Sequence, residues 1–148
     1  MNAIFVDSNV LLYCYDRRAG DKQRRAIETV ARLGELGTGR LSVQCLAEFY
    51  YRATRAHETL LTPEEAEGRV AAYVQSWTVF DLTPEIVAQA TRTARQHRLN
   101  YWDAQIWAAA RLNQVEVVFS EGFAAGSSLE GVRFVNPFAA EFELARWI

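Results

Sequence analysis

Short apolar runs alternate along this chain with longer stretches that have helical spacing. Residues 3–6 form the first run; they favour a strand, and the polar segment Asp7-Ser8-Asn9 follows them directly. Runs of the same kind predict four further strands, over residues 41–43, 78–82, 115–119 and 132–135. The chain is therefore expected to contain four or five short strands.

The segments between these runs carry helical signals. Residues 20–36 place apolar positions on one face and charged positions on the other, as an amphipathic helix does. Thr62-Pro63-Glu64-Glu65 and Thr83-Pro84-Glu85 each combine a capping residue, a proline and an acidic first turn, which predicts two helix starts. Further helices are expected over residues 9–15, 44–59 and 100–113, and a short one after Asn136-Pro137.

Strands that alternate with helices are typical of the α/β class. We therefore expect a three-layer α/β/α architecture with a four- to five-stranded parallel sheet, in one domain that spans residues 1–148. Residues 120–131 form the longest segment without a clear structural signal. Long loops in small domains are often functional.

Composition narrows the possible environments and partners. The net charge of −2 provides no global positive field for nucleic acid, so a polyanion would need local basic patches or metal ions. Cys14 and Cys45 lie in apolar helical stretches and are expected to be buried free thiols. His57 and His97 are isolated at helix positions expected to be exposed, which argues against zinc. The sequence shows no signal peptide and no membrane span, so a cytoplasmic protein is expected.

Acidic residues lie where a parallel sheet would gather them. Asp7 follows the first predicted strand and Ser120-Glu121 follows the fourth, and ligand sites in open α/β sheets lie beyond such carboxyl ends. Asp103 opens an apolar helix among aromatic residues, which is an awkward structural choice for a carboxylate. Glu48 joins them only if its helix folds back over the strand ends.

Each acid also has a purely structural interpretation. Asp7, Ser8 or Asn9 would cap the next helix, and Asp103 would pair with Asn100 in a capping box. Glu48 and Arg52 have the i,i+4 spacing of an exposed ion pair. Ser120-Glu121 would form a simple turn closed by Gly122.

Four segments in order resemble the motifs of PIN-domain nucleases: residues 6–13 (VDSNVLLY), 46–50 (LAEFY), 101–110 (YWDAQIWAAA) and 118–121 (VFSE) with 131–138 (GVRFVNPF). The last is similar to the closing motif of the bacterial branch that contains the VapC-type toxins of toxin–antitoxin pairs. The resemblance covers nearly the whole chain. Members of this branch usually carry a further Asp where this chain has Gly122.

The resemblance implies an endoribonuclease that uses Mg²⁺ or Mn²⁺, with Asp7, Glu48 and Asp103 as its acidic centre. It also implies RNA as substrate, a cognate antitoxin that blocks the site, and a homodimer. Asp7 and Asp103 are expected to bind the ion directly, Glu48 directly or through water, and Glu121 in place of the missing Asp. Carboxylates held together repel, so at least one should have a raised pKa, and a hard divalent ion relieves that repulsion.

Supporting residues follow from the same arrangement. Ser8, Asn9 and Ser120 are expected to hold the metal ligands by hydrogen bonds. RNA contacts are expected from five basic residues: Arg17, Arg18, Lys22, Arg52 and Arg55. Tyr50, Tyr51, Tyr101 and Trp102 flank the site, either as stacking surfaces for bases or as ordinary core residues.

Three other functions fit parts of the sequence. A module with weakened catalysis, with Gly122 as its lesion, would still bind RNA or a protein. A nuclease of RNA processing would share the chemistry without being a toxin. A phosphatase with Asp7 as nucleophile would usually carry a second Asp at the position of Asn9.

Overall fold

The structure is a computed structural model, and it describes residues 2–55, 59–123 and 126–148. The strands are β1 (Ile4–Val6), β2 (Gly39–Ser42), β3 (Thr78–Phe80), β4 (Val117–Phe119), β5 (Ser128–Leu129) and β6 (Val132–Val135). The helices are α1 (Ser8–Tyr13), α2 (Asp21–Leu36), α3 (Val43–Ala53), α4 (Pro63–Ser76), α5 (Pro84–His97) and α6 (Tyr101–Leu112), with a 3₁₀ turn at Leu144–Arg146.

The strands form one sheet in the order β3-β2-β1-β4-β6-β5. All neighbouring pairs are parallel except β5 with β6. The chain moves outward from β1 through β2 to β3 and then returns to β4 on the other side of β1. The strand order therefore reverses between β1 and β4, and such a reversal opens a crevice at the carboxyl ends of the two strands.

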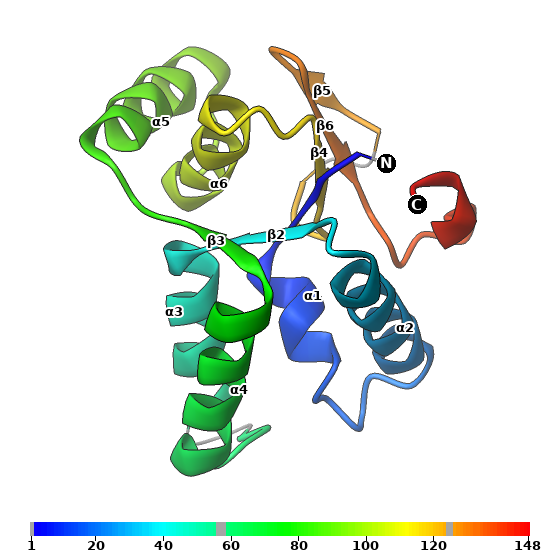
Figure 1. Cartoon of the computed structure of the whole chain (residues 1–148). Coiled ribbons are helices and arrows are strands. Elements are labelled where there is room, and N and C mark those ends of the chain that lie inside the picture. The colour runs from blue at the N-terminus through cyan, green and yellow to red at the C-terminus, as the bar shows by residue number, and fades with distance from the viewer. Residues whose placement is uncertain (1, 56–58, 124–125) are drawn as a thin grey trace.

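Helices cover both faces of the sheet (Figure 1). Helices α2, α3 and α4 contact β2 and β3, and α1 joins them through α2 and α3. Helix α6 contacts β4 and β6 on the opposite face and carries α5 with it. The reversal explains this division, because right-handed crossovers put connections that run in opposite directions on opposite faces. The α/β prediction with three layers is confirmed.

The core is densest around the two central strands. Every residue of β1 is fully buried. The large side chain of Trp107 is also fully buried, and its indole N–H donates to the Leu129 carbonyl of β5 at 2.9 Å. Trp77 lies directly over Gly39, where a Cβ atom would come within 2.2 Å of the ring. Only glycine leaves that space, so Gly39 lets the chain after α4 pack against β2.

The sheet has one strand more than the sequence suggested. Ser128 and Leu129 form β5, which pairs antiparallel with β6 through a two-residue turn at Glu130-Gly131. Both turn residues have positive φ angles, 44° and 85°, as a tight hairpin with the right twist requires. Glu-Gly is a weaker hairpin signal than Asn-Gly, so the sequence predicts no strand in this segment.

Helix α3 ends earlier than the predicted limit at residue 59. The Ala53 carbonyl accepts from the backbone N–H groups of Leu60 and Leu61, and the Thr54 hydroxyl donates to the Tyr50 carbonyl at 2.8 Å. These bonds replace the next helical turn. His57 lies outside the described residues. No helix in the described ranges is long and apolar enough to cross a bilayer.

Candidate functional site

Asp7 lies in the crevice where the strand order reverses. It follows β1, and its backbone N–H donates to the Phe119 carbonyl at the end of β4. The next residue of that segment, Ser120, donates its hydroxyl to Asp7 Oδ2 at 2.7 Å. Two residues that are 113 positions apart are thus joined by the pairing of β1 with β4.

Asp7 has both the structural and the candidate functional role. Its Oδ1 accepts from the Ser8 N–H at 2.7 Å and so caps α1. The Ser8 hydroxyl lies 3.5 Å from the same oxygen and 3.1 Å from Glu48 Oε1, so it bridges the two acids. Helix α3 therefore folds back over the strand ends, which was the condition for Glu48 to join the other acids. Within the described parts of the chain, Glu48 forms no ion pair with Arg52.

Asp103 approaches from the other layer, in the first turn of α6. The Asn100 side chain caps this helix by accepting from the Trp102 N–H at 2.9 Å. Among the residues that the structure describes, the Asp103 carboxylate accepts no hydrogen bond and forms no ion pair, so the capping-box interpretation does not hold. Its half-buried carboxylate is therefore available to bind a ligand.

The electrostatics show that the three acids act on one another. Burial raises the pKa of Asp7 from its ordinary 3.8 to about 6, against the opposing hydrogen bonds from Ser120 and Ser8, and the charges of Glu48 and Asp103 add to the increase. Burial and then the charge of Glu48 raise the pKa of Asp103, while Arg52 opposes this effect. The side chains thus create a negative potential that their surroundings do not neutralise.

This donor set fits a hard divalent cation. The donors are all carboxylate oxygens, which Mg²⁺ and Mn²⁺ prefer. The buried Asp7, only 5% exposed, faces two further negative charges. In the described ranges, no three His, Cys, Asp or Glu side chains lie close enough together to hold a metal ion. The fit to a cation therefore rests on the chemistry of the carboxylates and on the burial of Asp7.

Glu121 has a different environment. Its Oε1 accepts from the Tyr13 hydroxyl at 2.7 Å, and its Oε2 lies 2.6 Å from Lys22 Nζ. Burial raises the pKa of Glu121, but the bonds from Lys22 and Tyr13 together outweigh this effect and lower it. Both carboxylate oxygens are therefore engaged. Asn9 holds the same loop by accepting from the Glu121 N–H at 3.4 Å.

A groove of about 720 Å³ begins beside Glu48 and runs between α3 and the first turn of α6. Its lining includes Val43, Glu48, Tyr51, Arg52, Leu82 and Trp102. The Gln44 side chain spans the two helices, donating to the Trp102 carbonyl at 3.0 Å and accepting from Gln105 at 2.9 Å. Sequence reasoning missed these glutamines, although a Gln inside the Ala-rich stretch of α6 is a visible signal.

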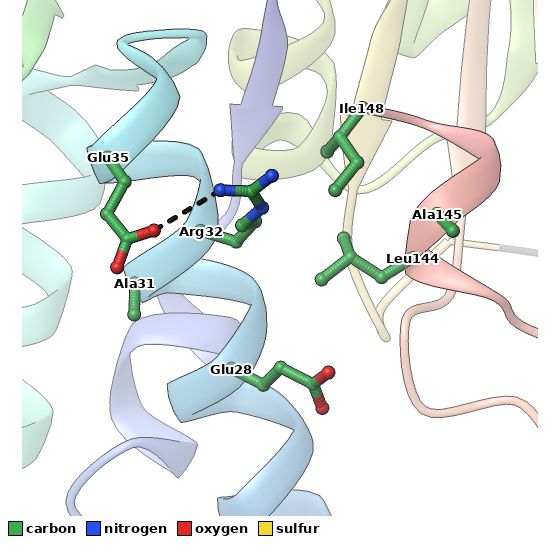
Figure 2. Close-up of a pocket in the computed structure, with 7 residues that line it drawn as sticks. All are labelled: Glu28, Ala31, Arg32, Glu35, Leu144, Ala145 and Ile148. Carbon is green, nitrogen blue, oxygen red and sulfur yellow. Dashed lines mark hydrogen bonds and ion pairs between the residues drawn. The ribbon is translucent and has the colours of Figure 1, made fainter.

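The predicted basic residues divide into two groups. Lys22 binds Glu121, and Arg18 lies 3.7 Å from Asp16, so part of the first cluster is paired locally. Arg52 and Arg55 line the groove instead. A second hollow of about 360 Å³ lies between α2 and the C-terminal segment, where Arg32 pairs with Glu35 and faces Leu144 and Ile148 (Figure 2). Asp7, Glu48, Asp103 and Glu121 do not line this second hollow.

Comparisons with known proteins agree with this fold. A family model described as the PIN domain matches residues 4–123. No curated protein matches the chain significantly. The fold is similar to VapC20 of Mycobacterium tuberculosis, a toxin that cleaves the sarcin-ricin loop, with TM-score 0.64 and 21% identity over 88% of this chain and 99% of that one. It is also similar to a toxin–antitoxin complex from Klebsiella pneumoniae, with TM-score 0.66 and 19% identity over 93% and 98%. DNA-bound VapBC from Salmonella typhimurium gives TM-score 0.63 and 18% identity over 90% and 97%.

Proposed function

The chain belongs to the PIN domain family, and on that premise we propose that it is a divalent-metal-dependent endoribonuclease, the toxin of a toxin–antitoxin pair. One observation carries the catalytic part. The Asp7 carboxylate is buried at the crevice between β1 and β4, shares the Ser8 hydroxyl with Glu48, and lies within the field of Asp103. The toxin assignment draws support from the structural neighbours, which include a toxin and toxin–antitoxin complexes.

Asp7, Glu48 and Asp103 would hold Mg²⁺ or Mn²⁺. Glu121 is not included in this ligand set, because Tyr13 and Lys22 engage both of its oxygens. When bound, the ion supplies a bound water of lowered pKa and neutralises charge on the scissile phosphate. Ser120 and Ser8 fix the orientation of Asp7 by hydrogen bonds to its two oxygens.

The chain's own residues would then position the reactants. Glu48 reaches the crevice from α3, where it would orient the attacking water and accept its proton. The water oxygen bonds to phosphorus as its proton passes to Glu48, the bond to the ribose oxygen breaks, and that oxygen takes a proton from solvent as it leaves. Phosphodiesters hydrolyse very slowly unaided, so the main contribution must come from groups already oriented for this charge.

The test is cleavage of RNA by the purified chain. We expect hydrolysis in Mg²⁺ or Mn²⁺ and none in EDTA. Asp103→Asn should cleave RNA more slowly than wild type, because it removes the charge of a carboxylate and keeps its shape. For the toxin role, expression should arrest growth, and co-expression of a small partner protein encoded next to it should restore growth and co-purify. The partner and a homodimer are part of this proposal. Cleavage without growth arrest would favour an RNA-processing nuclease.

A second candidate is a module of the same family that binds RNA or a protein with weakened catalysis. The observation that favours it is Gly122, together with a neighbouring Glu121 that is tied to Lys22 and Tyr13. Binding of RNA by the wild-type chain without hydrolysis in either ion would select this function. The phosphatase alternative gains no support from the PIN match.

A further inference from the structure

The groove beside Glu48 exposes aromatic rings next to the acidic site. Trp102 directly precedes Asp103 and is 55% exposed, and Tyr51 on α3 is 65% exposed. Large aromatic side chains usually gain stability by burial, so two of them exposed in one groove point to a ligand. Tyr50, the neighbour of Tyr51 in the chain, is also exposed but does not line the groove.

The exposed face of Trp102 is held in place. Its ring packs edge-on against Tyr101, with the ring centroids 5.1 Å apart. Its carbonyl accepts from Gln44 of α3, and Gln105 completes the link by donating to Gln44 and accepting from the Tyr101 hydroxyl at 2.8 Å. The stacking surface is therefore preorganised, and a ligand would lose little free energy in ordering it.

The charges in the groove select a polyanion. Arg52 lies one turn beyond Glu48 and acts on Asp103, yet within the described part of the chain it forms no ion pair within 4 Å. The Arg55 guanidinium lies 5.3 Å from the centre of the Tyr51 ring. Two arginines that line the same groove as exposed aromatic rings suit a phosphate backbone with bases. An apolar peptide would instead bury both cations without partners, which is costly.

We propose that this groove binds an unpaired nucleotide of the RNA, with its base stacked on Trp102 and a neighbouring phosphate held by Arg52. The position next to the scissile bond rests on the proposed nuclease function. The nucleotide must be unpaired, because a base inside an A-form duplex cannot offer its face to a side chain. Cleavage would thus be directed to single-stranded segments.

The test is binding of a fluorescein-labelled oligoadenylate octamer, measured by fluorescence anisotropy in EDTA so that no cleavage occurs. Trp102→Ala should weaken binding by about tenfold or more, and Trp102→Phe should stay within about threefold of wild type, because a smaller ring still stacks. Tyr51→Ala should weaken binding, while the matched change Tyr50→Ala should not. The same octamer in a duplex with oligouridylate should bind much more weakly.

Arginine variants give an independent readout. Arg52→Gln should lower the slope of log affinity against log salt by about 0.7, the contribution of one phosphate contact with a single strand. The matched control is Arg32→Gln, which changes an exposed arginine on α2 and should leave the slope unchanged. Equal slopes for the two variants would overturn the phosphate contact.

The outcomes separate this inference from the proposed function. If Trp102→Ala and Trp102→Phe both bind like wild type, or lose affinity equally, the stacking site is wrong even if RNA is cleaved. If Trp102→Ala dissociates a dimer in light scattering without changing RNA affinity, the groove binds a second copy and the inference is overturned. If stacking holds but Mg²⁺ and Mn²⁺ give no cleavage, the nuclease function fails and the RNA site stands.

Discussion

A carboxylate follows each of the two central strands, and the surroundings of the two carboxylates shift their pKa values in opposite directions. Asp7, after β1, is buried among hydroxyl groups and other acids, and its pKa rises to about 6. Glu121, after β4, is half-buried, bonded to Lys22 and Tyr13, and its pKa falls. Similar sheet positions therefore produce one carboxylate without a counter-charge and one that is already neutralised.

The difference teaches which acid is available to a metal ion. Binding a cation at Glu121 would first require breaking an ion pair, whereas at Asp7 it would relieve an unfavourable charge. An uncompensated buried carboxylate costs stability, and proteins retain such groups where function needs them. The region around Asp7 therefore has the properties of a reactive site, and the region around Glu121 those of a structural link between α2 and β4.

The largest expected effect follows from removing the charge at Asp7. Asp7→Asn keeps the size of the side chain and its cap on α1 but removes the charge at the centre of the crevice. We expect RNA cleavage to fall by about a hundredfold to a thousandfold, the range for loss of one well-placed electrostatic group. The initial rate in Mg²⁺ measures it.

The matched control is Glu121→Gln, which likewise removes the charge of one carboxylate, here after β4. Its cleavage rate should stay within about threefold of wild type. Equal losses for the two variants would show that both acids bind the ion and would end the distinction drawn above.

The pH dependence of stability sharpens the comparison. The folded-state pKa of Asp7 lies above its ordinary value, so the folded protein binds this proton more tightly and loses stability as pH rises through about 6. Between pH 5 and pH 8 the metal-free protein should lose about 1.4 kcal/mol from this group. Urea unfolding in EDTA measures the loss, and Asp7→Asn should remove it. If Asp7→Asn loses as much unfolding free energy between pH 5 and pH 8 as wild type does, the raised pKa does not belong to Asp7.

The sequence predicted the positions of the acids better than their environments. Asp7 at a strand end and the helix starts at Thr62 and Thr83 followed from local signals, and the structure has the corresponding caps. These signals are local, since a cap or a strand end depends on a few neighbouring residues. The α/β class followed from the alternation of strands and helices.

What the sequence did not reveal depends on contacts between distant segments. Tyr13 and Lys22 reach Glu121 across about a hundred residues, so no local pattern shows that this acid is neutralised. The groove likewise exists because Gln44 of α3 meets the first turn of α6. The strand β5 was missed for a different reason, since it is two residues long and its turn has an unusual sequence.

Gly122 offers a way to change the region after β4 into one like the region around Asp7. A Cβ atom there would lie 3.5 Å from Ser120 Oγ and 3.7 Å from Asn9 Nδ2, which is ordinary contact. Gly122→Asp should therefore fold and add a carboxylate beside the serine that binds Asp7. We expect Mn²⁺ affinity, measured by calorimetry, to rise by about threefold to tenfold, because one more hard oxygen ligand joins the site.

Gly122→Asn is the control, because it has the same shape without the charge. If Asn raises Mn²⁺ affinity as much as Asp does, the gain comes from packing of the loop. If neither changes affinity, the crevice does not extend to this position, and the ion contacts only the side of β1.

The smallest effect belongs to the link between Lys22 and Glu121. Both side chains are partly exposed, so solvent weakens their attraction, and the pair should contribute about 0.2–1 kcal/mol. Urea unfolding of the double-mutant cycle of Lys22→Gln and Glu121→Gln measures this coupling free energy. The coupling should shrink in 1 M salt, because ions then screen charges over about 3 Å. A coupling well above this range that also resists salt would mean that the link is buried in solution. Glu121 would then be part of the buried core. The comparison above would lose its basis, because it depends on a solvent-accessible ion pair that neutralises Glu121.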